Sequence, residues 1–319
     1  ISLCLLTILI LYFEKFKENW EVYYMTFGML IGQTLFPIWL FQGLEKMKYI
    51  TYLNISSKIF FTILIFIFVK EKSDYLLVPF FTSLGFILVG IWSLIIAIKK
   101  FKIIFKWQPI SNLKLQLIDG WHVFFSSISI SLYTISATFI LGILTNNSTV
   151  GQFAAADKII QALKGLYSPI SQSIYPLVGK KIAENKKEGL RFIYKTTWLV
   201  GLGMFIFSLV IYLFAEQIVF VLLGDTFQQS IILLKIMSFL PFVIVLSNMF
   251  GIQTMLNLGY KKAFSNILVL AAILGISLSL IFISTFKAKA TAFIMLFVET
   301  FVTITMWLYL RKKLKIQYK

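Results

Sequence analysis

Long apolar stretches recur along this chain of 319 residues and constrain its fold more than any other feature. Hydrophobic residues make up 59% of the chain and charged residues only 13%, whereas a soluble domain is about 25% charged. A stretch of about 20 apolar residues can cross the hydrocarbon core of a bilayer, which is roughly 30 Å thick. No strand-like alternation is visible, and in lipid only helices and closed barrels satisfy their own backbone. We therefore predict an all-α polytopic membrane protein.

The apolar stretches divide into ten predicted transmembrane segments: 1–13, 22–42, 49–69, 75–98, 119–144, 151–178, 192–214, 230–256, 263–286 and 290–310. The connections and flanks after the even-numbered segments, with the C-terminal tail, hold 20 Lys and Arg residues, and the others hold 6. Because Lys and Arg are enriched in cytoplasmic loops, we expect the C-terminus to be cytoplasmic. The first segment resembles a cut helix, so a cytoplasmic N-terminus would require an even number of further spans before it.

The longest connection, residues 99–118, carries five lysines among apolar residues and Trp107. This composition is typical of an amphipathic stretch lying at the inner membrane interface. It separates four apolar segments from six. We predict four parts in the chain: the second part of an N-terminal lobe at 1–98, a cytoplasmic inter-lobe linker at 99–118, a six-helix C-terminal lobe at 119–310 and a basic cytoplasmic tail at 311–319.

Three of the prolines inside predicted helices are candidates for a kink or hinge, namely Pro37, Pro169 and Pro176. Pro37 precedes the tight charged turn "GLEKMK" (43–48), and a proline within a helix removes a backbone hydrogen bond and kinks it. Packing explains a kink at Pro37 as well as a hinge or a cavity lining does. We expect Pro169 and Pro176 to break the lower half of segment 151–178, as in helices that line a transport cavity.

Segment 151–178 carries the clearest polar pattern. Polar side chains recur every three or four residues and so share one face of a helix: Asp157, Gln161, Lys164, Ser168, Gln172 and Tyr175. We call these six residues the polar stripe. The other face, with Ile159 and Leu166, is apolar. The stripe therefore predicts either a transport cavity or a set of hydrogen bonds between helices.

Ionisable residues within membrane segments are costly and are functional by default. Lys58, Lys164 and Glu299 lie near segment centres, and Asp157, Lys158 and Lys235 lie toward the outer side. Asp157 and Glu299 are candidates for proton or sodium coupling. Two structural alternatives stay open, in which Lys58 forms a buried ion pair with Glu299 and Asp157 is a local counter-ion of Lys158.

Several stretches resemble the O-antigen and oligosaccharide flippases, which form the polysaccharide-exporter branch of the multidrug/oligosaccharidyl-lipid/polysaccharide exporter superfamily. They are "FPIWLFQGLEKMKYIT" (36–51), "SLYTISATFILG" (131–142), "VGQFAAADKIIQALKGLYSPISQSIYP" (150–176) and "FLPFVIVLSNMFGIQTMLNLGYKK" (239–262). The resemblance implies twelve transmembrane helices in two lobes around a central cavity, of which ten are visible here in an N-terminally truncated chain.

The resemblance also implies a function, the movement of a polyprenyl-pyrophosphate-linked oligosaccharide across the bacterial inner membrane by alternating access. Expected partners are that cargo, membrane lipids, and polymerase and chain-length proteins of the same pathway. Since pyrophosphate is a dense anion, the cavity should offer fixed cations, and lysine acts on phosphate as a point charge. Lys164 is the first candidate, followed by Lys158 and Lys235. The rest of the predicted substrate-binding surface is Gln161, Ser168, Gln172 and Tyr175.

Two other functions fit parts of the sequence. A multidrug antiporter of the same superfamily would place acidic groups in its cavity, whereas lysine is in excess here. A membrane glycosyltransferase or polymerase would need a large extramembrane loop, and the longest connection has about 20 residues. We expect no catalytic residue, cofactor, metal or nucleic-acid partner. The chain has no Gly-x-x-x-x-Gly-Lys-Ser/Thr loop, and Cys4 is its single cysteine.

Overall fold

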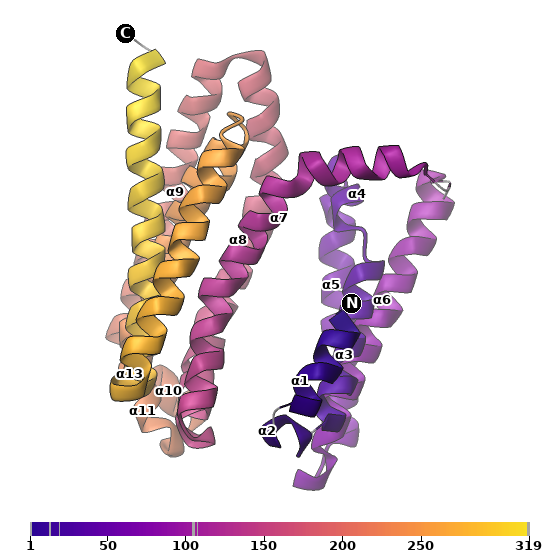
Figure 1. The fold of residues 1–319 in the computed structure, drawn as a ribbon, viewed down its shortest axis with the longest axis vertical. Coiled ribbons are helices and arrows are strands. Elements are labelled where there is room, and N and C mark those ends of the chain that lie inside the picture. Colours follow the sequence, from indigo (N-terminus) through magenta and orange to yellow (C-terminus); the bar gives the residue numbers. More distant parts are fainter. Residues whose placement is uncertain (1, 13, 19, 104–105, 107, 318–319) are drawn as a thin grey trace. The chain divides into compact units, whose positions relative to one another are not determined.

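The structure, a computed structural model, describes residues 2–12, 14–18, 20–103, 106 and 108–317. The regular elements in these ranges are helical, as predicted, and none of them is a strand. Contacts between Cα atoms divide the chain into two compact units, Ile1–Trp107 and Gln108–Lys319 (Figure 1). We call them the N-terminal unit and the C-terminal unit.

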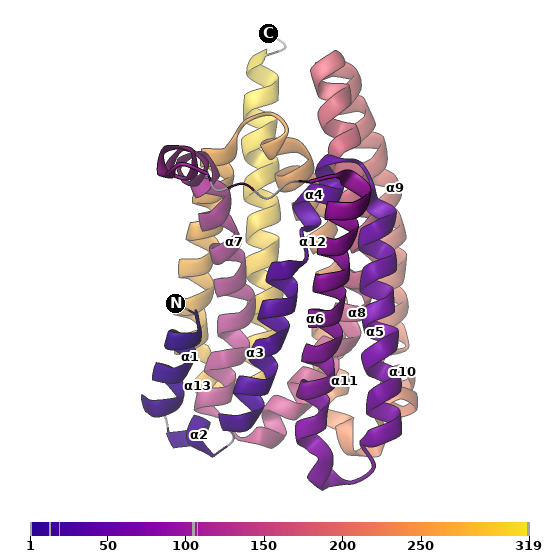
Figure 2. The ribbon, with the colours of Figure 1, turned by 90° about the vertical axis from the view of Figure 1, so that its right-hand side faces the viewer.

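The described residues of the N-terminal unit form six α-helices and one short 3₁₀ helix. Their bounds are Ser2–Tyr12 (α1), Glu14–Lys17 (α2), Trp20–Leu35 (α3), Ile38–Gly43 (α4), Met47–Phe68 (α5), Lys72–Leu76 (η1) and Leu77–Phe101 (α6). Helix α6 packs against both α3 and α5, and Figure 2 shows the three helices side by side. An aromatic cluster of Phe36, Phe41, Tyr49 and Phe101 joins α4, α5 and the end of α6.

Helices α3 and α6 meet through small residues. A Cβ atom on Gly32 would lie 2.3 Å from the carbonyl carbon of Phe86, and one on Gly90 would lie 2.6 Å from the carbonyl oxygen of Gly32. At the same contact the hydroxyl of Ser83 donates a hydrogen bond to the carbonyl oxygen of Met25. Small residues allow close approach of helices in lipid, where apolar burial between them gives little drive. The two backbones are therefore in direct contact.

The kink predicted at Pro37 is a complete break between two helices. Helix α3 ends at Leu35 and α4 begins at Ile38, while Pro37 itself has a non-helical ψ of 69°. The cause is the missing N–H of proline, which cannot continue the helical hydrogen bonds. Beyond α4 the backbone N–H of Lys46 donates to the carbonyl of Phe41 (2.8 Å), closing the tight turn. A hinge role for Pro37 stays a prediction.

The C-terminal unit contains the remaining helices. Their bounds are Ile110–Leu144 (α7), Asn147–Glu184 (α8), Lys186–Leu213 (α9), Ala215–Leu223 (α10), Asp225–Phe227 (η2), Gln228–Met237 (α11), Leu240–Asn248 (α12), Met249–Leu256 (η3, a π-helix) and Lys261–Gln317 (α13). Lys287 has non-helical backbone angles (φ 51°, ψ −132°), so α13 has two arms, residues 261–286 and 288–317. Figure 1 shows these arms running antiparallel.

One apolar core joins the helices of the C-terminal unit. It includes Leu141 of α7, Ile160 of α8, Leu234 of α11, Met255 of η3 and Ile283 of α13, all fully buried. Helix α7 packs mainly against α13, and α8 packs against α9 and α11. The core therefore holds α8, the helix that carries the polar stripe, against the rest of this unit.

Both ends of the predicted linker 99–118 are helical, and the division of the chain into four parts stays a prediction. Helix α6 continues to Phe101, where the left-handed Lys102 (φ 53°) ends it, and α7 already begins at Ile110, directly after Pro109. Trp107 lies outside the described residues. The predicted tail 311–319 is likewise not a separate element in its described part, because α13 continues to Gln317. Charged residues alone did not mark these helix ends.

In the described ranges, seven helical stretches are long and apolar enough to cross a membrane: Trp20–Gly43, Met47–Phe68, Ser73–Phe101, Val123–Leu144, Lys186–Leu213, Asp225–Leu256 and Lys261–Leu314. The last stretch contains both arms of α13, α1 is short, and the polar residues of α8 lower its hydropathy. The chain is thus an all-helical membrane protein with several spans. The count of ten of twelve, and the central cavity, stay predictions.

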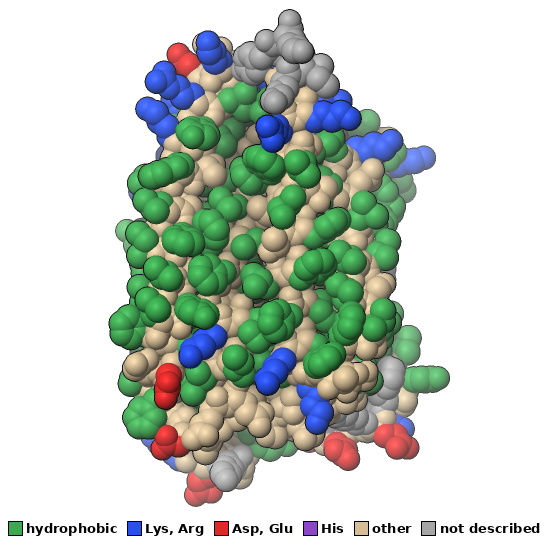
Figure 3. All heavy atoms as spheres, turned by 90° about the vertical axis from the view of Figure 1, so that its left-hand side faces the viewer, with side chains coloured by type: hydrophobic (Ala, Val, Ile, Leu, Met, Phe, Trp, Pro, Cys, Tyr) green, Lys and Arg blue, Asp and Glu red, His purple; other side chains and the backbone are tan. Residues whose placement is uncertain are grey.

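Basic residues gather at one end of the C-terminal unit, where α8 ends, α9 begins and both arms of α13 have their free ends (Figure 1). We call this the basic end. It carries Lys180, Lys181, Lys186, Lys187, Arg191, Lys195, Lys261, Lys262, Arg311, Lys312 and Lys313. In Figure 3 most Lys and Arg side chains lie at the upper end of one face, whereas the lower end carries most of the acidic side chains together with a few Lys or Arg. This distribution agrees with the asymmetry of the predicted loops.

Candidate functional site

Helix α8 is buried on one face and carries the polar stripe beside it. The buried side chains are Phe153, Ala156, Ile160, Tyr167 and Val178. Within the stripe Gln161, Ser168 and Tyr175 are exposed, and Asp157, Lys164 and Gln172 are half-buried. The stripe is therefore not sealed inside the C-terminal unit.

The apolar face opposite the stripe packs only in part. Ile159 and Leu163 lie against the core of the C-terminal unit, whereas Leu166, on the same face, is 63% exposed. The most buried side chains of α8 include Ala156, Ile160 and Tyr167, each one position before a stripe residue, and α8 packs against α9 and α11. Helix α8 thus has a polar open side and a partly open apolar side.

The prediction that Pro169 and Pro176 break α8 is wrong. The helix runs from Asn147 to Glu184 with both prolines inside it. A proline removes one helical hydrogen bond, and packing against neighbouring helices can hold the remaining turns in place. A role of these prolines in bending stays a prediction.

Hydrogen bonds link successive turns of the stripe. The side-chain amide nitrogen of Gln161 lies 3.4 Å from both carboxyl oxygens of Asp157, and that of Gln172 donates to the hydroxyl of Ser168 (3.0 Å). Between these pairs, Lys164 is close enough to the carboxyl groups of Asp157 and Glu299 to interact with both electrostatically. Lys164 is thus the one cation among the six stripe residues, and two acidic groups act on it electrostatically.

Glu299 is deeply buried, with 4% of its surface exposed. Its carboxyl group accepts hydrogen bonds from the hydroxyl of Tyr133 on α7 (3.0 Å) and from the hydroxyl of Ser247 on α12. Buried acidic groups require such partners, because an unpaired polar group away from water is costly. Glu299, which lies in α13, is therefore hydrogen-bonded to both α7 and α12.

The other predicted site residues lie apart from this group. Lys158 is exposed next to Asp157, while Lys235 lies in α11 beside a hollow that it shares with Glu216 and Asp225. Lys58 is exposed on α5 of the N-terminal unit, and its pairing with Glu299 stays a prediction. The C-terminal unit thus brings Asp157, Gln161, Lys164 and Glu299 together and places Lys235 elsewhere.

A buried amide network follows directly after Ser247. The side-chain oxygen of Asn248 accepts hydrogen bonds from Tyr167 (2.8 Å) and Ser171 (2.9 Å), both on α8. Gln253 donates to the backbone carbonyl of Ser171 (3.0 Å) and to Asn248 (3.4 Å). Gln253 is 0% exposed, and its own carbonyl oxygen has no partner among the described protein atoms. This oxygen is an acceptor available to a proton donor that enters the network.

Sequence reasoning missed this network, whose members are Tyr167, Ser171, Asn248 and Gln253, and also missed Tyr133 and Ser247, the two partners of Glu299. Asn248 and Gln253 were visible as two amides inside an apolar segment, but their spacing of five does not place them on one face of an α-helix. The π-helix η3, with its wider turn, brings both amides to α8. Such single turns of π-helix are frequent at functional sites.

Replacing Asn248 with alanine should lower the stability of the C-terminal unit by about 1–2 kcal/mol. Tyr167 and Ser171 would both lose their acceptor, and such a loss typically costs about 1–3 kcal/mol for a buried donor and less in a membrane. The measurement is the apparent Tm of the purified protein in detergent. Asn147→Ala, at an exposed asparagine in the first turn of α8, is the matched control. Equal shifts in the two variants would contradict the network.

Chemically, the site offers one cation, on which two acidic groups act electrostatically, with hydroxyl and amide donors along the same helix. An anion that binds Lys164 would offset part of the positive charge that acts on Asp157 and Glu299. Binding of an anion would therefore change the electrostatic surroundings of a buried acidic group that is joined to three helices. This property suits a site that couples ligand binding to a change in helix packing.

Comparisons with known proteins agree on one family. Residues 1–181 match the family model described as polysaccharide biosynthesis protein. A protein of Escherichia coli (strain K12) is 37% identical over 311 residues, which cover 98% of this chain and 75% of the relative. A protein of Shigella dysenteriae is 28% identical over 278 residues, covering 87% of this chain and 69% of the relative. Both carry the name "Putative O-antigen transporter". No solved structure gives a significant match.

Proposed function

Since the chain belongs to the polysaccharide biosynthesis protein family, we propose that it is a flippase for a polyprenyl-pyrophosphate-linked oligosaccharide. Polysaccharide or O-antigen export is supported by the names of two relatives that match most of the chain. The observation that carries the finer proposal is Lys164, an ammonium group on the open polar side of α8. In this proposal Lys164 binds the pyrophosphate while the sugars contact Gln161, Ser168, Gln172 and Tyr175.

The proposed mechanism is alternating access between two lobes. The polar stripe lines the passage between them, and Lys158 and Lys235 attract the anion toward the outer side. Binding of pyrophosphate at Lys164 weakens the hold of that ammonium on Asp157 and Glu299, which are the candidates for proton or sodium coupling. No bond of the cargo is broken, so the protein is a transporter and not an enzyme.

In this proposal the protein lies in the bacterial inner membrane with its C-terminus in the cytoplasm. The cargo is loaded from the cytoplasmic leaflet and passed to polymerase and chain-length proteins on the other side. The excess of basic residues at the basic end supports this orientation, because Lys and Arg are enriched on the cytoplasmic side.

Complementation tests the function. A full-length gene containing this sequence, expressed in a strain that lacks its own O-antigen flippase, should restore polysaccharide on the cell surface. The readout is the ladder of O-antigen chains on a lipopolysaccharide gel, with membrane protein level measured by immunoblot. Normal protein level without any surface polysaccharide, in a strain that makes the matching repeat unit, would refute the proposal.

Cysteine labelling tests the orientation. In a Cys4→Ser background, Lys187→Cys at the basic end should react with a membrane-impermeant maleimide only after the cells are permeabilised. Ser148→Cys, at the opposite end of α8, should react in intact cells that have an opened outer membrane. Both positions are exposed, so accessibility depends on the side of the membrane alone. The reverse labelling pattern would invert the topology.

A further inference from the structure

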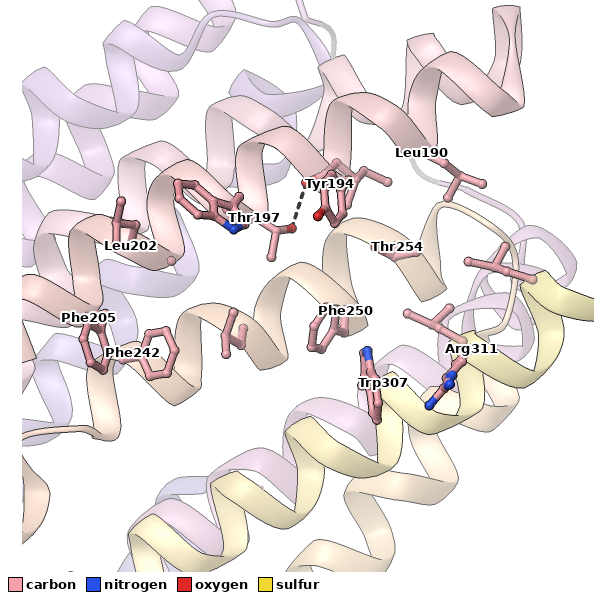
Figure 4. Close-up of a pocket in the computed structure, with 16 residues that line it drawn as sticks. Leu190, Tyr194, Thr197, Leu202, Phe205, Phe242, Phe250, Thr254, Trp307 and Arg311 are labelled. Carbon is pink, nitrogen blue, oxygen red and sulfur yellow. Dashed lines mark hydrogen bonds between the residues drawn. The ribbon is translucent and has the colours of Figure 1, made fainter.

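A long apolar groove of about 710 Å³ runs along the C-terminal unit between α9, the helix formed by α12 and η3, and the second arm of α13. Its volume falls in the range of about 300–1,000 Å³ typical of small-molecule sites. Figure 4 shows Phe205 and Phe242 toward one end of the groove, and Leu190 with Arg311 toward the other. The groove is separate from the polar stripe, since none of its described lining residues belongs to α8.

The walls of the groove are apolar over most of its length. Two threonines contribute to the lining, but each hydroxyl donates to its own helix, Thr197 to the carbonyl of Ile193 (2.8 Å) and Thr254 to that of Met249 (2.7 Å). Because both hydroxyls already donate hydrogen bonds within their own helices, the middle of the groove offers little to a polar ligand. An occupant of this part should be a flexible hydrocarbon.

The chemistry changes at the basic end. Arg311 is the one charged side chain among the sixteen described lining residues, and its guanidinium lies 5.4 Å from the centre of the Trp307 ring. Trp198 and Tyr194 are exposed on the α9 side of the same groove. Trp and Tyr at this position are typical of the level where lipid headgroups meet the hydrocarbon. An anionic group at Arg311 would complement the charge of this end.

The length of the groove also suits a lipid of one leaflet. Leu190 and Phe205 are fifteen residues apart on α9, which corresponds to about 22 Å along a helix. Half of a bilayer core of roughly 30 Å is about 15 Å, so the groove covers the depth of one leaflet and reaches its headgroup level. A single acyl chain can lie along it.

We infer that this groove binds one anionic phospholipid, with its phosphate at Arg311 and one acyl chain along α9 toward Phe205 and Phe242. A zwitterionic lipid fits less well, because its ammonium group would meet Arg311 and the lysines of the basic end without an acidic partner in the described lining. The lipid would fill the space between α9 and the second arm of α13 and so fix their separation. This inference does not depend on the cargo proposed above.

Quenching of tryptophan fluorescence by brominated lipids tests the proposed lipid site, because Trp198 and Trp307 line the groove. The purified chain is placed in phosphatidylcholine vesicles that contain increasing fractions of phosphatidylglycerol with a brominated acyl chain. Brominated phosphatidylcholine serves as the reference. We expect phosphatidylglycerol to quench tryptophan fluorescence at about fivefold lower mole fraction, the ratio that corresponds to about 1 kcal/mol per basic residue near a membrane surface.

Variants assign this excess quenching to the groove. Arg311→Gln should abolish the preference for phosphatidylglycerol, whereas Lys313→Gln removes the same charge from an exposed residue outside the lining and should retain it. Thr197→Phe, which places a ring in the groove, should also abolish it. Trp307→Phe should reduce the size of the quenching signal.

Three results would overturn the inference. They are equal quenching by the two brominated lipids, an undiminished preference in Arg311→Gln, and displacement of brominated phosphatidylglycerol by polyprenyl phosphate at a lower mole fraction than by unbrominated phosphatidylglycerol. The last result would assign the groove to the polyprenyl chain of a carrier. Complementation of O-antigen export is measured separately, so failure of the lipid site and failure of the flippase proposal are distinguishable.

Discussion

Replacing Lys164 with glutamine should lower O-antigen export at least tenfold at equal protein level in the membrane. The substitution leaves a polar side chain that is one atom shorter and removes the one cation of the polar stripe. A tenfold loss corresponds to about 1.4 kcal/mol, whereas two unit charges 4 Å apart near a protein surface attract each other by about 4 kcal/mol. A tenfold loss of export is therefore smaller than the full loss of a direct contact between Lys164 and pyrophosphate would produce. The measurement is the amount of surface O-antigen in the complemented strain.

Two further variants serve as controls for Lys164→Gln. Lys164→Arg retains the charge and should retain most of the export, because a guanidinium also binds phosphate. Lys180→Gln removes a lysine from the exposed last turns of the same helix and should leave export unchanged. Export at the wild-type level in Lys164→Gln would refute the pyrophosphate site at this lysine. It would leave the transport function itself in place.

Replacing Gly32 with alanine should strongly reduce the amount of folded protein, although alanine favours a helix by about 1 kcal/mol over glycine. The added Cβ atom would lie 2.3 Å from the carbonyl carbon of Phe86, and a backbone atom cannot rotate away. Helices α3 and α6 would have to separate along their whole contact. Overpacking of a well-packed core typically costs about 1–3 kcal/mol, and a clash with the backbone lies at the upper end of that range.

Gly203→Ala is the matched control, since it makes the same change in the interior of helix α9, where a Cβ atom would meet nothing within 4 Å. This variant should be neutral or slightly stabilising. Size-exclusion chromatography of detergent extracts after heating would report the apparent Tm and the yield of both variants. If Gly32→Ala were as stable as Gly203→Ala, the close packing of α3 on α6 would be wrong.

The candidate site divides into a part that sequence predicts and a part that it does not. Lys164 and Glu299 stand out because charged residues are rare inside apolar segments, and the polar stripe stands out because its spacing matches one helical face. Nothing in the spacing of Asn248 and Gln253 predicts that both meet α8, because their contact depends on a π-helical turn. Tyr133 and Ser247 are ordinary residues of apolar helices until the fold brings them to the carboxyl group of Glu299.

For the prolines, too, the sequence predicts only part of the backbone structure. Pro37 ends α3, where a tight turn follows, whereas Pro169 and Pro176 lie in an α8 that continues through both. A proline removes the same hydrogen bond in each case. Whether the helix then stops depends on the neighbours that hold the next turns, and a single segment of sequence does not contain those neighbours.

Hydrophobicity, charge and periodicity in the sequence alone determined that the chain is an all-helical membrane protein, and which face of helix α8 is polar. These properties record whether each residue favours lipid or water, which is a local preference. The exporter family entered separately, through the resemblance of four stretches of sequence. The tertiary structure alone decided the direct backbone contact of α3 with α6, the burial of Glu299 between three helices and the apolar groove that ends at Arg311. Each depends on the distance between segments far apart in the chain, and that distance is set by how the helices pack.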